Sequence, residues 1–156
     1  MSKSPNCNWV LAVFIAIVSV GVCVVPAFAH HSFAMYDQDK VLVFTGVAHQ
    51  FIAQASHAEL HFYVIGADGK LERDENGNLI DWGVEMAGAA ALAQEGMTGE
   101  SFKSGTIFTL HMNPLRTGGH FGSRVGPVYK CPWRTPPALG KTCDTVQGMT
   151  VISGKY

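Results

Sequence analysis

Apolar and polar positions alternate along much of the chain. In residues 58–64 the even positions are apolar and the odd positions are polar or aromatic, and the same period of two recurs at 80–86 and 108–112. Side chains that alternate in this way lie on opposite faces of a β-strand. The pattern therefore predicts three strands, each with one face toward a hydrophobic core.

Three more elements complete the predicted order. Residues 40–52 are apolar on both faces near their start, which indicates a strand, and Gly46 suggests a bulge or bend there. A strand at 123–130 contains Pro127, which lacks a backbone N–H, so we expect this strand at a sheet edge. The Ala-rich segment 87–95, which precedes Gly96, predicts a short helix with a glycine at its C-terminal end.

The element order is β-β-β-α-β-β, and residues 149–152 could add a last short pairing. This order predicts a mainly β fold, an OB-like, five-stranded, partly open barrel with one short helix between strands 3 and 4. A β-sandwich with an additional helix is the alternative. We expect one such domain over residues 30–156.

The N-terminal segment has the pattern of a signal peptide. Lys3 precedes an apolar, uncharged run at 10–25, and Ala27 and Ala29 form an A-x-A pair. We expect residues 1–29 to be a signal peptide that is cleaved after Ala29, which predicts a periplasmic or secreted protein without stable membrane insertion. An uncleaved anchor is the alternative, because the run is only slightly shorter than the ~20 residues that span a bilayer.

The charge balance narrows the choice of partners. The chain has 11 Lys and Arg against 12 Asp and Glu, a formal net charge of −1, and we find no basic cluster. Nucleic-acid binding proteins usually carry such a cluster, so we expect no nucleic-acid partner. We therefore expect the partner to be a metal ion or a small ligand of the cell envelope. The sequence does not predict the oligomeric state.

Two of the four cysteines, Cys131 and Cys143, lie outside the predicted leader. In an oxidising compartment they are expected to form a disulfide. A pair of metal ligands is the alternative, but eleven residues separate the two cysteines, and the prolines between them indicate a stiff loop.

The main candidates for a functional site are the seven histidines, which can bind metal ions. After cleavage, His30 would have a free α-amine and an imidazole, which can chelate one ion, and imidazole suits Cu, Zn and Ni. A further His from the barrel would complete a copper-binding histidine brace, whereas His31 would instead give an exposed square-planar copper clamp. A solvated arm that binds no metal selectively is the alternative.

The other histidines differ in how well they suit a site. On a strand, His57 and His61 are about 13 Å apart at ~3.3 Å per residue, too far to share one ion. His57 lies at the start of its strand and is the better ligand, whereas His61 and His49 are expected to be outward strand residues. His111 and His120 flank one turn and are secondary candidates. No catalytic residue is assigned, because no nucleophile or triad pattern occurs, and an enzymatic role stays open.

Several short motifs resemble one known family. They are A-H-H-S-F at 29–33, a Gly-Val strand at 46–47, W-x-x-E at 82–85 and the Ala-rich helix that ends at Gly96. Together they resemble a family of secreted bacterial proteins of unknown function, domain-of-unknown-function family 6152. His57 stands at the His of that family's N-P-H motif, although Ala-Ser precedes it here. The resemblance implies a compartment and a fold, suggests a site at His57 and assigns no activity.

These observations lead to one main expectation about function. We expect a periplasmic protein that binds a transition metal, copper most of all, through His30, His31 and His57. The alternative is a periplasmic binding or structural module that binds no metal and has no catalytic activity.

Overall fold

The structure is a computed structural model that describes residues 31–152. The chain divides into two compact units, Met1–Ala34 and Met35–Tyr156. The described part of the first unit contains the short helix α2 (His31–Ala34). The expected signal peptide and His30 lie outside the described residues. Within those residues, no helix is long and apolar enough to cross a membrane.

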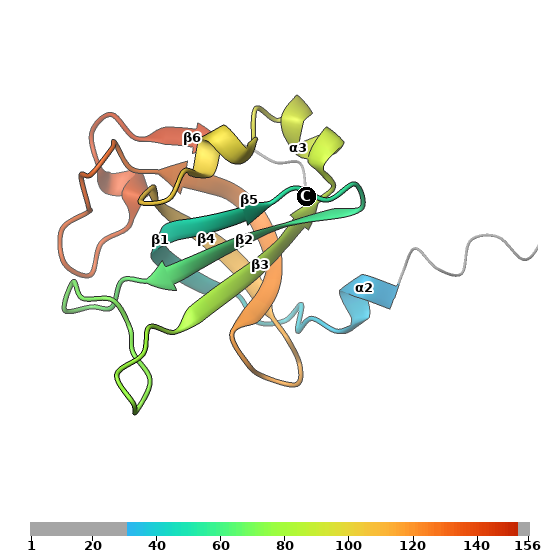
Figure 1. The fold of residues 1–156 in the computed structure, drawn as a ribbon, viewed down its shortest axis with the longest axis horizontal. Helices are drawn as coiled ribbons and strands as arrows, with labels where there is room; N and C mark the ends of the chain where they lie inside the picture. The colour runs from blue at the N-terminus through green and yellow to red at the C-terminus, as the bar shows by residue number, and fades with distance from the viewer. Residues whose placement is uncertain (1–30, 153–156) are drawn as a thin grey trace, which may run out of the picture. The chain divides into compact units, whose positions relative to one another are not determined.

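The second unit is built on one curved sheet (Figure 1). Its strands in residues 31–152 are β1 (Leu42–Ile52), β2 (His57–Val64), β3 (Asp81–Ala87), β4 (Ile107–Pro114), β5 (Phe121–Lys130) and β6 (Thr150–Ile152). They follow the order β3-β2-β1-β4-β5-β6, and an additional parallel pairing of β3 with β5 closes the first five into a barrel. The mainly β, OB-like prediction is confirmed, and the parallel pairing makes the barrel a closed one.

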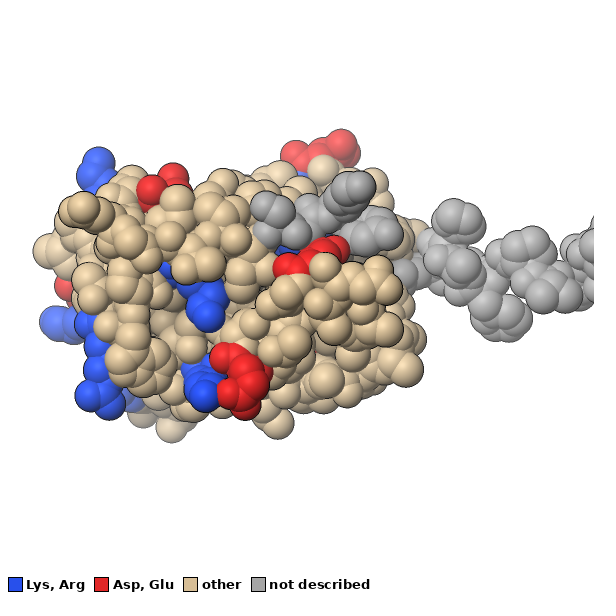
Figure 2. All heavy atoms as spheres, turned by 90° about the horizontal axis from the view of Figure 1, so that it is seen from above, with Lys and Arg blue, Asp and Glu red and all other residues tan. Residues whose placement is uncertain are grey.

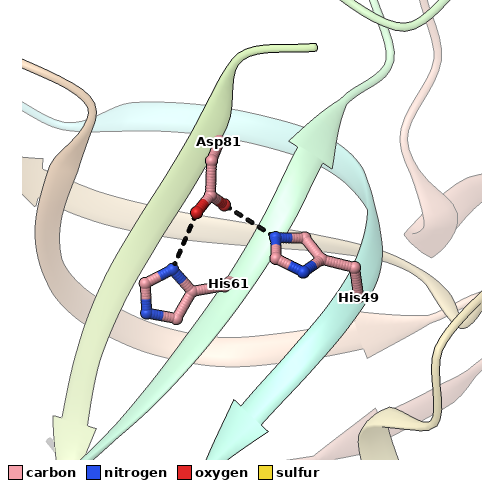
Figure 3. A group of neighbouring side chains, drawn as sticks. All are labelled: His49, His61 and Asp81. Carbon is pink, nitrogen blue, oxygen red and sulfur yellow. Dashed lines mark hydrogen bonds and ion pairs between the residues drawn. The ribbon is translucent and has the colours of Figure 1, made fainter.

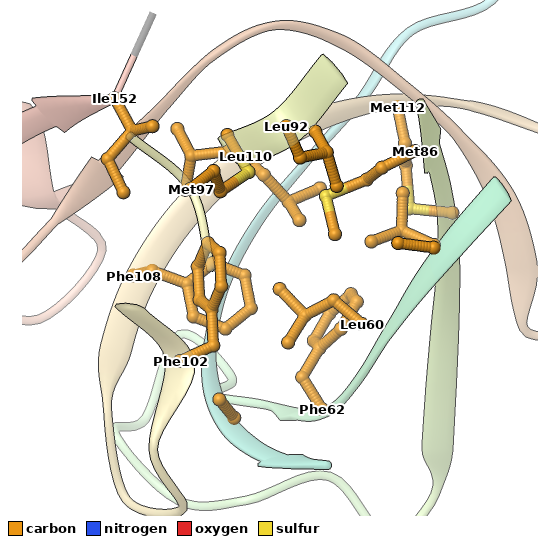
Figure 4. Packing of buried hydrophobic residues seen from close by; sticks show 14 of the residues in the cluster. Leu60, Phe62, Met86, Leu92, Met97, Phe102, Phe108, Leu110, Met112 and Ile152 are labelled. Carbon is orange, nitrogen blue, oxygen red and sulfur yellow. The ribbon is translucent and has the colours of Figure 1, made fainter. Parts of the chain in front are cut away.

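The interior of the barrel follows from the alternating pattern. Every second residue of β2, from Ala58 to Val64, is buried, and the residues between them are not. On β4, Phe108, Leu110 and Met112 belong to the buried core, as predicted, while Thr109 between them is buried as well. The rings of Phe62, Phe102 and Phe108 meet in this core (Figure 4).

The short helix lies between β3 and β4, as predicted. Helix α3 (Ala89–Gln94) ends before Gly96, which has a φ of 77°. The Met97 N–H donates to the Leu92 carbonyl and the Gly96 N–H to the Ala93 carbonyl, the two hydrogen bonds of a Schellman motif. Leu92 and Met97 are both buried, so this ending turns the chain back onto the barrel core.

The predicted edge position of the fifth strand is wrong. Strand β5 pairs with β4, with β6 and, in parallel, with β3. Pro127 lies where the β4–β5 register shifts, since Thr109 pairs with Tyr129 while His111 pairs with Val125. The missing N–H of Pro127 therefore falls in an irregular stretch and does not interrupt a regular ladder.

The predicted disulfide is present between Cys131 and Cys143, whose Cα atoms are 5.0 Å apart. Cys143 begins the short 3-10 helix η2 (Cys143–Thr145) and its backbone N–H donates to Oγ1 of Thr109 on β4 at 2.9 Å. The bond thus closes a loop that starts at the end of β5 and returns to the barrel wall.

We expect replacement of both cysteines by serine to destabilise the barrel. For a loop of 12 residues, the lost restriction of the unfolded chain corresponds to about 3 kcal/mol of the free energy of unfolding. Urea denaturation of the oxidised protein and of the C131S/C143S variant measures this difference. A loss below about 1 kcal/mol would contradict the expected contribution of loop closure.

Candidate metal-binding site

The outer face of β2 carries a row of ionisable and aromatic side chains. Because Ala58, Leu60, Phe62 and Val64 fill the interior, the residues between them point away from the core. Asp81 and Glu85 of β3 lie on the same outer face, since β3 pairs with β2 in antiparallel register. We call this set the outer strip; its members are His57, Glu59, His61 and Tyr63 of β2 and Asp81 and Glu85 of β3.

A β-bulge brings His49 of β1 to the outer strip. Ala48 pairs with Phe62 and Gln50 pairs with His61, so His49 is the extra residue on β1. Ala48 is buried and Phe51 packs against the core, three positions apart instead of two. The bulge therefore leaves His49 outside the core, next to His61.

Three side chains from three strands meet there (Figure 3). His49 Nε2 lies 2.7 Å from Oδ1 of Asp81, and His61 Nδ1 lies 3.2 Å from Oδ2 of the same carboxylate. One potential ligand atom from each residue lies within 4.8 Å of the other two. The side chains of His49 and His61 are about three-quarters buried, while that of Asp81 is 50% exposed.

Two imidazoles and a carboxylate form a ligand set that transition metals use. Zinc, copper, nickel and iron(II) all bind such nitrogen and oxygen donors. Metal–ligand bonds of about 2.0–2.2 Å would require the donors to turn from their mutual hydrogen bonds toward one ion. The group can therefore hold a metal ion and leave coordination positions open to solvent.

Neighbouring side chains hold both imidazoles in place. The ring of His49 stacks on Tyr63, with centroids 4.5 Å apart and an interplanar angle of 18°. His61 Nε2 lies 3.2 Å from Oε2 of Glu59, while its other ring nitrogen faces Asp81. Such outer partners fix the orientation of a ligating histidine and raise its basicity.

A second arrangement occupies the other end of the outer strip. His57 Nδ1 lies 3.1 Å from Oε1 of Glu85, and the Tyr36 hydroxyl donates to Oε2 of that carboxylate at 2.8 Å. Tyr36 is almost fully buried. Burial, followed by the hydrogen bond to Glu85, raises the pKa of Tyr36 well above its ordinary value, so the phenol remains a donor.

The residues that the sequence proposed as ligands lie on different elements of the described chain. His57 is not in the three-residue group, and His31 lies in α2. His111 is on β4, and His120 precedes β5 with its ring against Trp82, at a centroid distance of 4.8 Å. A site formed by these two histidines therefore stays a prediction, as do the roles of His30 and His31.

Sequence reasoning predicted His49 and His61 as outward strand residues, which is confirmed, but missed that they meet Asp81. One signal was available in the chain. The inward positions Phe44, Gly46 and Ala48 follow a period of two that breaks before Phe51. A break of this kind marks a bulge, and here it leaves His49 and Gln50 on the outer face.

We expect the buried phenol to make stability depend on pH in the alkaline range. Above the ordinary pKa of 10.0, the unfolded chain loses the Tyr36 proton while the folded chain keeps it. The free energy of unfolding therefore falls with rising pH, by up to about 1.4 kcal/mol per pH unit from this group. In Y36F this part of the fall disappears, which urea denaturation at a series of pH values measures.

The same variant should also be less stable at neutral pH, by about 1.5–3 kcal/mol, because it loses a hydrogen bond to a charged group. Y129F is the matched control, since Tyr129 pairs with Thr109 and lies six residues along β5 from Ser123, the partner of Glu85. Equal alkaline slopes for Y36F and the unchanged protein would contradict the assignment.

Comparison with known proteins identifies the family of this chain. The model of a family of unknown function, DUF6152, matches residues 16–124, which is more than half of the chain. Neither the search of curated proteins nor that of solved structures gave a match. The matched range includes the histidine motif at 29–33 and all the residues of the outer strip. The chain belongs to the family of unknown function DUF6152.

Proposed function

We propose that this protein binds one divalent transition-metal ion through His49, His61 and Asp81. The observation that carries the proposal is the approach of their donor atoms to within 4.8 Å of one another. The three residues come from β1, β2 and β3, so the position of each depends on the pairing of the barrel strands. Ligands on paired strands are held more firmly than ligands on loops.

Copper is the ion we favour, and zinc is next. Among the divalent first-row ions, copper binds nitrogen and oxygen donors most tightly. The half-exposed carboxylate of Asp81 gives an ion a path from solvent. With the expected signal peptide, we place this binding in the periplasm or outside the cell.

A purely structural role is the competing explanation of the same contacts. His49 and Asp81 would then be an ion pair that joins two strands, and pairs with partly exposed partners contribute only about 0–1 kcal/mol. This explanation predicts no saturable metal binding. It also predicts that the histidines can be replaced one at a time with little effect beyond stability.

Calorimetric titration with Zn²⁺ distinguishes the two explanations, with Cu²⁺ as a second probe. Loss of an outer partner of a metal ligand typically weakens the affinity by about 10–100-fold. H49A and D81N remove ligands themselves, so we expect each to weaken the affinity by at least that much. E59Q alters only the partner of His61, so we expect it to weaken the metal affinity by about 10–100-fold. H111A is the matched control, because it removes an imidazole outside the group. Unchanged affinity in H49A and D81N would exclude this site.

A second candidate site follows from how His57 is held. Glu85 engages its Nδ1, and among residues 31–152 its Nε2 has no hydrogen-bond partner. A histidine oriented by a carboxylate through one nitrogen presents the other to a metal. The side chain is 46% exposed, so an incoming ligand has access to it.

The length of the chain between His30 and Tyr36 allows His30 to be proposed as a second ligand beside this nitrogen. Tyr36 is connected to His57 by two polar contacts through Glu85, of 2.8 Å and 3.1 Å. Six residues from His30 to Tyr36 can extend about 20 Å at ~3.3 Å per residue. We therefore propose, as the alternative, that copper is bound by the amine and ring of His30 together with His57, with His31 as a further ligand.

Cu²⁺ titration of the processed chain in the D81N background tests this alternative separately. We expect H57A to weaken the remaining copper binding by at least about tenfold, because it removes one of the donors. H120A is the matched control, since it replaces another exposed histidine. If D81N and D81N/H57A bind copper equally, His57 is not a ligand of copper bound at His30, whatever the result for His49.

A further inference from the structure

A polar cavity lies on the side of the barrel formed by β5, β6 and the 3-10 helix η1 (Gly99–Phe102). Its volume is about 340 Å³. The lining includes Glu100, Lys103, Thr106, Lys130, Trp133 and Thr150. None of these residues belongs to the outer strip or to the group around Asp81, so the cavity is separate from the proposed metal site.

Lys130 is the most unusual residue of the cavity. It ends β5 and pairs with Phe108 on one side and Thr150 on the other, which fixes its backbone in the sheet. The side chain makes no ion pair or hydrogen bond with any of the described residues. Partial burial lowers the pKa of its amine, so the ammonium loses hydration without a counter-charge. An anion placed in the cavity would supply that charge.

The cavity lining carries a net positive charge. The Lys103 ammonium lies 2.6 Å from Oε2 of Glu100, so these two groups balance each other. Two lysines and one glutamate give the lining a net charge of +1 at neutral pH, carried by Lys130. Figure 2 views the molecule from the side on which Figure 1 draws β6, and basic side chains gather in the left half of that face.

Trp133 adds a flat apolar surface at the same place. It is 58% exposed, which is high for a tryptophan. Its Cη2 atom would lie 3.5 Å from a Cβ atom at Gly105, and the guanidinium of Arg134 lies over the ring, 5.7 Å from its centroid. The disulfide at Cys131 anchors the segment that carries this indole.

The backbone next to this indole is strained. Arg134 has a φ of 56°, the one positive value among the non-glycine residues that the structure describes. Such conformations cost free energy and cluster at ligand-binding sites. This turn holds an exposed indole in the same cavity as an ammonium that no residue of 31–152 pairs with, as a binding site would require.

From these contacts we infer that the cavity binds a small anionic sugar. Its carboxylate or phosphate group pairs with Lys130, its ring stacks on Trp133, and the hydroxyls of Thr106 and Thr150 are available to its own hydroxyls. A ring is required because the indole offers area and not charge, and an acid is required because the Lys130 ammonium has no partner among residues 31–152. This inference does not depend on the proposed metal binding.

NMR titration with three probes tests the inference: D-glucuronate, D-glucose 6-phosphate and D-glucose. We expect saturable shifts of the Trp133 indole resonance with at least one acidic sugar and none with D-glucose. The acid that binds more tightly identifies whether a carboxylate or a phosphate is preferred. Indole shifts that are equal for the acidic sugars and for D-glucose, or that are absent for all three, would overturn the inference.

Variants of two lysines give the second readout. K130M should weaken acidic-sugar binding at least tenfold, because it removes the charge but keeps most of the side-chain volume. K70M is the matched control, since Lys70 is exposed and pairs with Asp68 outside the cavity. Equal affinity in K130M and the unchanged protein would overturn the role of Lys130, and D81N should have no effect on sugar binding.

Discussion

The parallel pairing of β3 with β5 is the contact on which the arrangement of the molecule depends. Glycine lies on both strands at the contact, at positions where neighbouring residues leave no room for a Cβ atom. A Cβ at Gly83 would meet the ring of Phe121, and one at Gly122 would meet Met112 and the Asn113 carbonyl. Closure also holds β3 between β2 and β5, so that its outward carboxylates remain beside the histidines of β2.

Much of the fold could be predicted from the sequence because its signals are local. The alternation at 58–64, the Ala-rich helix before Gly96 and the two cysteines outside the leader each depend on residues that are near in the chain. The position of β5 could not be predicted in this way. Pro127 indicates an edge only when the surrounding ladder is regular, and a register shift in β5 removes that condition.

The candidate site was harder to predict than the fold, because it depends on register. His49, His61 and Asp81 lie on three different strands, and no spacing along the chain brings their side chains together. A shift of one residue in a strand pair moves a side chain to the opposite face of the sheet. The sequence could indicate that each histidine points outward, but only the paired strands show which carboxylate each one meets.

The bulge at His49 has a consequence for how such a site arises in a lineage. If this one residue were absent, Ala48, Gln50 and Phe51 would continue the in-out alternation of β1 without interruption, and the hydrophobic interior would keep the same members. A single-codon insertion can thus furnish an OB-like barrel with an additional imidazole on its exterior. Descendants that lose that codon would retain the architecture and lose this imidazole.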